Sequence, residues 1–198
     1  FLELNDQAAI YINGKAFENH FSKRANGVTY IGLDQELFAN PRFVFLEDDF
    51  VIDDELCIFS NVQGERCRAI ANDDLLMEKD GQRLVDDFCH EQNLIIREKN
   101  QLVLVAGCAH RGIINILDHM ALNYDLQPTF VIGGFHLYNR TRKKSESKEL
   151  IESIGNELLV SESRYYTCHC TGVEPYQMLK TILGDQINYL ATGSQVKI

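Results

Sequence analysis

Three of the six histidines stand where apolar, strand-like segments end. They are His110, His136 and His169. Neutral imidazole is the commonest protein ligand for zinc, iron and similar ions. A single histidine of this kind would indicate little, but three in equivalent positions predict a metal site.

The residues beside His110 could also bind an anion. Gly107 and Gly112 flank this histidine, and small residues let the backbone turn sharply and let a ligand approach. A helix that begins at Gly112 would present free N–H groups and a positive dipole, and Arg111 would add a charge. We therefore predict that Arg111 and Gly112 bind the anionic group of a substrate. The alternative is that His110 only forms hydrogen bonds within a strand–helix turn.

Cys168, His169 and Cys170 form a run of three possible metal ligands. Side chains alternate between the two faces of a strand. If residues 165–170 are a strand, the two cysteines share one face and His169 points to the other. We therefore expect His169 to join His110 in one site, while the cysteines pack inside.

His136 follows Gly133 and Gly134, a pair that indicates close backbone approach at a strand end. It could be a metal ligand, a hydrogen-bond donor to a ligand, a substrate contact or an exposed loop residue. A basic loop comes next, and it could attract a phosphate or carboxylate, although a solvated helix entry is the commoner explanation. The loop contains Arg140, Arg142, Lys143, Lys144 and Lys148.

The remaining polar candidates have weaker patterns. Four of them stand close together without regular spacing: Asp86, Asp87, His90 and Glu91. Such groups can serve as bases or ligands, but here surface polarity is the favoured interpretation. His20 and His119 lie in amphipathic, helix-like contexts, which favours structural or exposed roles.

The elements that must position the three histidines follow from hydrophobic spacing in the second half of the chain. Apolar runs predict strands, and apolar residues at helical spacing predict helices between them, in the order β-α-β-α-β-α-β. The predicted strands are 101–107, 128–134, 163–172 and 187–193, and the helices start near 113, 146 and 174. Ligands gather where the strands of such sheets end, so the histidines should meet at one edge.

The first half of the chain is harder to interpret. Short strands are predicted at 9–12, 28–33, 43–46 and 56–62, and 94–98 forms a hairpin with 101–107. Residues 63–90 show no clear pattern, and a lid over the site is one interpretation of them.

Composition narrows the class of protein. The 198 residues are enough for one domain with a proper core, and the formal net charge is −10. Residues 1–100 carry 20 acidic against 10 basic side chains, which opposes binding to nucleic acid or to an anionic membrane. No apolar run approaches the roughly 20 residues that cross a bilayer. The six cysteines form no Cys-x-x-Cys pair, so we predict reduced thiols and a cytoplasmic location.

Four segments together resemble a known family. They are Gly107-Cys108-Ala109-His110-Arg111-Gly112, Gly133-Gly134-Phe135-His136-Leu137, His169-Cys170-Thr171-Gly172 and Ala191-Thr192-Gly193. In this order they resemble the C-terminal part of a metallo-β-lactamase-fold hydrolase. The branch that they resemble most is the 7,8-dihydropterin-6-methyl-4-(β-D-ribofuranosyl)-aminobenzene-5′-phosphate synthase-like proteins.

The resemblance implies an α/β fold, a four-layer αββα sandwich with a dinuclear metal site at one edge. His110 matches the histidine that completes one metal's ligand set, and His169 matches the late histidine that binds the other metal. His136 stands where many members of the superfamily have a bridging Asp. The family's His-x-His-x-Asp-His motif does not occur in this sequence, which therefore resembles a fold that is incomplete at the N-terminus.

These features predict what the protein does. Residues 1–198 should form a single domain, the C-terminal portion of a metal-dependent hydrolase or transferase. The intact parent should act on a small, anionic, phosphorylated molecule through a metal-activated hydroxide. It should bind two divalent ions, zinc ahead of iron or manganese.

Because its metal site would be incomplete, the chain as given should be inactive, and a homodimer could cover the exposed sheet edges. The alternative is a non-catalytic module of the same fold that binds a ligand. A nuclease is the weakest of the candidates, because no basic or aromatic groove is evident.

Overall fold

A seven-stranded mixed sheet organises the molecule in the computed structural model, which describes residues 2–197. Its strand order is β15-β14-β11-β10-β9-β6-β5. The strands are β5 (Phe50–Val51), β6 (Leu56–Phe59), β9 (Asn93–Glu98), β10 (Gln101–Ala106), β11 (Phe130–Gly133), β14 (Arg164–Thr167) and β15 (Ile187–Tyr189). The last four run parallel to one another, whereas β9, β6 and β5 pair antiparallel.

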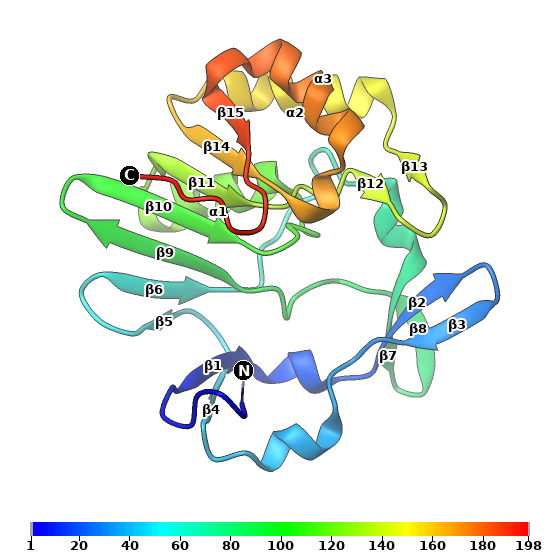
Figure 1. Ribbon diagram of the computed structural model, residues 1–198. Coiled ribbons are helices and arrows are strands. Elements are labelled where there is room, and N and C mark those ends of the chain that lie inside the picture. The colour runs from blue at the N-terminus through cyan, green and yellow to red at the C-terminus, as the bar shows by residue number, and fades with distance from the viewer. Residues whose placement is uncertain (1, 198) are drawn as a thin grey trace.

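Three helices connect the parallel strands, as the hydrophobic spacing predicts. They are α1 (Ile113–Tyr124), α2 (Lys148–Leu159) and α3 (Val173–Leu183). Figure 1 shows α2 and α3 packed together beside β14 and β15. A continuous row of buried side chains crosses the sheet beneath the helices: Ile187, Tyr165, Val131, Leu104 and Ile95. This core fixes the relative positions of the strand ends.

The helices begin in two different ways. The Ser147 hydroxyl accepts a hydrogen bond from the Leu150 N–H and caps α2. Helices α1 and α3 begin after Gly112 and Gly172, whose φ angles of +86° and +80° favour glycine. The sharp turns at these glycines place the strand ends of β10 and β14 next to the helix starts.

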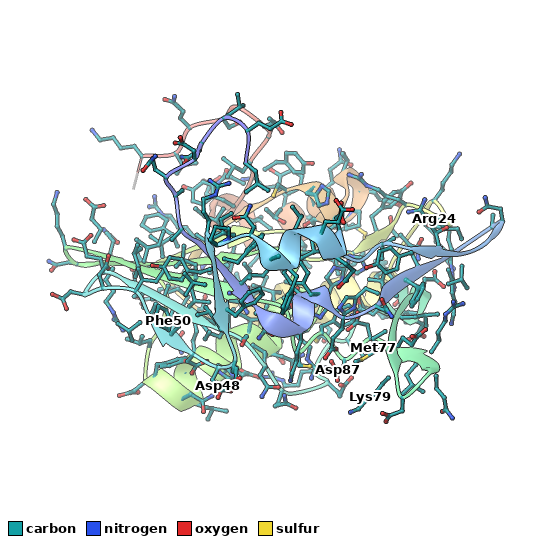
Figure 2. The ribbon with its side chains drawn as sticks, turned by 90° about the horizontal axis from the view of Figure 1, so that it is seen from below. Arg24, Asp48, Phe50, Met77, Lys79 and Asp87 are labelled. Carbon is teal, nitrogen blue, oxygen red and sulfur yellow. The ribbon has the colours of Figure 1, made fainter. Side chains whose placement is uncertain are left out.

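The rest of the chain forms smaller sheets. Strands β1 (Ile10–Asn13) and β4 (Phe43–Leu46) pair in parallel, and β12 (Tyr138–Asn139) pairs with β13 (Lys144–Ser145). A four-stranded sheet has the order β3-β2-β7-β8, from β2 (His20–Arg24), β3 (Gly27–Tyr30), β7 (Leu75–Lys79) and β8 (Gln82–Val85). Figure 2 shows Asp48 and Phe50 at one end of the molecule and Arg24 and Lys79 of the four-stranded sheet toward the other.

Several boundaries differ from the sequence predictions. The strand predicted at 163–172 ends at Thr167, and a 3-10 turn over His169–Thr171 follows. His20 belongs to strand β2, not to a helix, and residues 63–90 contain β7 and β8. Strand β2 pairs with β7, more than 50 residues away, so the local pattern around His20 did not predict it. No helix within residues 2–197 is long and apolar enough to cross a membrane.

Candidate functional site

A cavity of about 600 Å³ lies where the strand ends of the large sheet face the smaller sheets. Its lining includes five of the six histidines, namely His20, His90, His110, His136 and His169. Cys108, Asp86 and Arg140 also line it. The three predicted metal ligands are thus gathered at one cavity, together with two histidines from the first half of the chain.

The predicted histidines reach the cavity from loops that are tied to one another. The Gly134 N–H donates to the Gly107 carbonyl (2.8 Å), and this contact joins the loops after β11 and β10. Ring centroids of His110 and His136 lie 4.1 Å apart. His136 and His169 both have left-handed backbones, with φ of +48° and +50°. Such strain in non-glycine residues is retained only where the surrounding structure enforces it.

Two side chains hold the His110 segment. The Asn72 amide donates to the His110 carbonyl (2.6 Å), and its oxygen lies 3.2 Å from His110 Nδ1. The Glu91 carboxylate accepts the backbone N–H groups of His110 (2.7 Å) and Arg111 (3.1 Å). The ring of Phe88 stacks on His110 at 4.7 Å. Sequence reasoning missed Asn72 altogether, because the η3 turn (Ile70–Asp74) that carries it has no recognisable motif.

His136 is half-buried beside His110. Its Nδ1 atom is buried and has no hydrogen-bond partner among the described residues. Burial, together with the neighbouring His110 and His169, lowers the pKa of His136 to about 3. Its imidazole is therefore neutral at neutral pH, the form that binds metals.

His169 faces the basic loop. The Arg140 guanidinium lies 3.4 Å from His169 Nδ1. Because guanidinium groups only donate, His169 Nδ1 is the acceptor in this contact. Arg142, in the same loop, forms an ion pair with Asp74 instead. Arg140 is the residue of this loop whose charge faces the cavity.

The cysteines near His169 do not follow the alternation expected of a strand. Because β14 ends at Thr167, Cys170 lines the same cavity as His169, and the prediction of opposite faces is wrong. Cys170 Sγ lies 3.5 Å from the Cys108 carbonyl oxygen. Hydrogen bonds from the Cys170 and His110 side chains lower the pKa of the Cys108 thiol. The hydrogen bond between the two cysteine side chains also raises the pKa of Cys170.

A compact cluster in the cavity was not predicted as a site. His20 and Asp86 are buried, with His20 Nδ1 2.8 Å from Asp86 Oδ2, and His90 Nδ1 lies 3.8 Å from Asp86 Oδ1. The interpretation of Asp86 as surface polarity is therefore wrong. Among the described residues, the ligand atoms of these three form the one group of metal-binding side chains that all lie within 4.8 Å of one another. The strand-end histidines are more widely spread.

The charges of this cluster balance. Burial is the largest single effect and opposes charge on both His20 and Asp86, but their mutual hydrogen bond, their backbone hydrogen bonds and the attraction of neighbouring charges together outweigh it. The pKa of His20 is consequently raised and that of Asp86 lowered. Burial lowers the pKa of His90 to about 4, so its imidazole is neutral at neutral pH.

Arg111 and Gly112 lie outside the lining of the histidine cavity. The Arg111 guanidinium donates to the carbonyls of Val62 (2.8 Å) and Gly64 (3.0 Å) and lines a separate cavity of about 230 Å³. These bonds tie the loop after β6 to the start of α1. The substrate-binding role of Arg111 and Gly112 stays a prediction.

The fold and the site define a class of protein. A solved structure described as Tm1679, a metal-dependent hydrolase of the beta-lactamase superfamily, matches 98% of this chain and 73% of its own, with a TM-score of 0.79 and 26% identity. The predicted metallo-β-lactamase fold is therefore confirmed. No protein-family model matches the chain.

Two proteins of Methanocaldococcus jannaschii are similar in sequence. An uncharacterized protein is 26% identical over 193 residues, which cover 94% of this chain and 68% of that protein. The organism's 7,8-dihydropterin-6-methyl-4-(beta-D-ribofuranosyl)-aminobenzene-5′-phosphate synthase is 24% identical over 120 residues, covering 60% of this chain. The matched region spans 39% of the synthase.

Proposed function

We propose that this chain is part of a metal-dependent hydrolase or transferase that acts on a small, phosphorylated substrate. The observation that carries the proposal is one cavity lined by five histidines in a fold shared with a metal-dependent hydrolase. The similarity to a synthase whose name contains a 5′-phosphate supports the choice of substrate class.

The chemistry of the donor set fits a divalent metal. His110, His136 and His169 would contribute ligands to such ions, and the unpartnered Nδ1 of His136 is an atom that a metal would satisfy. Zinc suits imidazole ligands. When bound, the ion would supply a hydroxide nucleophile at neutral pH.

The other residues of the cavity would bind and orient the substrate. Arg140, beside His169, offers a planar guanidinium that suits a phosphate group. Asn72 and Glu91 hold the His110 segment and so keep its ring in place. Phe88 covers the ring of His110 and limits the access of water to it.

The test is hydrolysis of phosphomonoesters and phosphodiesters by the full chain, with zinc, manganese or iron(II) added and the bound metal counted. The comparison pairs His110→Ala/His169→Ala with His119→Gln, which changes the one histidine outside the cavity lining. We expect the double variant to lose bound metal, together with any hydrolysis that the added metal supports, while His119→Gln keeps both.

Two results would contradict the proposal. Unchanged metal content in the double variant would remove the strand-end histidines as ligands. Metal binding without hydrolysis of any phosphoester, but with tight binding of a phosphorylated ligand, would favour a non-catalytic binding module.

A further inference from the structure

We propose that His20, Asp86 and His90 bind a divalent metal ion of their own, distinct from the ion assigned to the strand-end histidines. The inference goes beyond the proposed function, because it requires neither hydrolysis nor His110, His136 and His169. It rests on the compactness of the cluster, on the hydrogen bonds that its members form with the surrounding backbone, and on its opening to the cavity.

The cluster already has the dimensions of a metal site. Its three ligand atoms all lie within 4.8 Å of one another, and the rings of His20 and His90 are 4.3 Å apart. Zinc lies about 2.0–2.2 Å from nitrogen and carboxylate ligands, so ligands of one ion are about 3–4 Å apart. Small rotations of these side chains would therefore close them on an ion.

The outer hydrogen bonds orient two of the ligands. His20 Nε2 lies 3.2 Å from the Lys15 carbonyl, to which it can donate, and this leaves Nδ1 directed at the cluster. Asp86 Oδ1 accepts from the Phe88 N–H (2.8 Å). Metal-bound histidines and carboxylates are typically anchored by such partners, which fix the ring tautomer and orientation.

The burial pattern leaves one side open. The side chains of His20 and Asp86 are 8% and 5% exposed, whereas His90 is 26% exposed. All three line the cavity that contains His110. Two imidazoles and one carboxylate, with the remaining positions facing a cavity, suit zinc or iron(II).

The competing explanation is a structural ion pair. Protonated His20 would donate to both Asp86 and the Lys15 carbonyl, and His90 would only pack against them. In that case the cluster would stabilise the fold without affinity for metals. The two explanations differ in metal stoichiometry, which can be measured without an activity assay.

The experiment is a titration of the full chain with Co²⁺ and with Zn²⁺, followed by calorimetry and by the visible spectrum of cobalt. We expect Asp86→Asn and His90→Gln each to weaken one metal-binding event. The loss of affinity should exceed the roughly 10–100-fold that follows when only a hydrogen-bond partner of a metal ligand is removed. His119→Gln should bind as the parent does. The double variant His110→Ala/His169→Ala should keep this binding event. The result therefore distinguishes a failure of this inference from a failure of the proposed function.

A variant that adds a spectroscopic signal distinguishes loss of the metal site from misfolding. His90→Cys keeps a zinc-binding side chain at the least buried position and should add a thiolate-to-cobalt band to the difference spectrum. Circular dichroism checks that each variant folds. Equal stoichiometry and affinity in the parent, Asp86→Asn and His90→Gln, with no new band in His90→Cys, would overturn the inference in favour of the ion pair.

Discussion

Two groups of histidines face the same cavity, and they are built in opposite ways. His110, His136 and His169 follow strands of one parallel sheet, and two of them have left-handed backbones. His20 and His90 come from separate segments and meet at Asp86, where a hydrogen bond balances the buried charge. The first group is held in place by the surrounding fold, whereas the second helps to stabilise it.

The difference indicates that the cluster at Asp86 contributes to stability, whereas the strand-end histidines are available to bind a ligand. Strand-end loops are held by contacts from other segments, such as those of Asn72 and Glu91 with the His110 segment, and can present imidazoles to a ligand. A buried ion pair tolerates no such freedom, because an unpaired charge is costly in the interior. Breaking the ion pair at Asp86 should therefore cost more stability than a substitution at a strand-end histidine.

The largest effect is expected at Asp86. Asp86→Ala leaves His20 buried without its partner, and breaking such a pair costs about 3–5 kcal/mol of unfolding free energy. Urea denaturation at pH 6 measures it. A loss below about 1 kcal/mol would show that the cluster does not stabilise the fold.

The next effect is the pH dependence of stability, which separates His90 and His136 from His20. His90 and His136 have folded pKa values of about 4 and about 3, below the unfolded value of about 6.5. The unfolded chain binds more protons, so stability falls as pH drops from 6.5 toward 3, on the order of 3 kcal/mol for each residue. Denaturation in EDTA across this range should show a flatter slope for His136→Gln and for His90→Gln.

In the ion pair, His20 changes stability with pH in the opposite direction to His90 and His136. The raised pKa of His20 contributes stability below pH 6.5 that is lost as pH rises through the folded pKa. The lowered pKa of Asp86 contributes stability above about pH 3.8 that is lost as pH falls through its folded pKa. The pair therefore stabilises most between about pH 4 and 6.5. Asp86→Asn should remove this maximum, and an unchanged profile would contradict it.

A smaller effect is expected at Asn72, which is almost fully buried beside His110. Asn72→Ala leaves the His110 carbonyl without its donor, at a cost of about 1–2 kcal/mol. Asn72→Asp is the matched control, because it keeps the acceptor and loses the donor. Thermal melting measures both, and equal melting temperatures for Asn72→Ala and the parent would contradict the role.

The smallest effect is expected at the strand end itself. His169→Gly relieves about 1 kcal/mol or more of left-handed strain and adds roughly 0.5–1 kcal/mol of chain entropy to the unfolded state. The net change should stay within about 1 kcal/mol, with His169→Ala less stable than His169→Gly. If the alanine variant were the more stable one, this account of the backbone would be wrong.

The sequence predicted the second half of the fold well. Helices α1, α2 and α3 and the strands between them lie where hydrophobic spacing placed them. Local signals suffice there, because each strand–helix unit is continuous in sequence and its period is set by burial on one face. The first half gave weaker predictions, and strands β2, β7 and β8 were missed. Strand β2 pairs with β7 more than 50 residues away, whereas β7 and β8 form a local hairpin within a segment that showed no clear pattern.

By itself the sequence determined that His110, His136 and His169 would share one edge of a sheet, because parallel strands joined by helices must end on the same side. It did not determine that Arg111 binds loop carbonyls while Arg140 faces the cavity. It also left the cluster at Asp86 unrecognised. Only the tertiary structure decided these points, because side-chain partners across long sequence separations depend on how the sheets pack, and no local pattern encodes that packing.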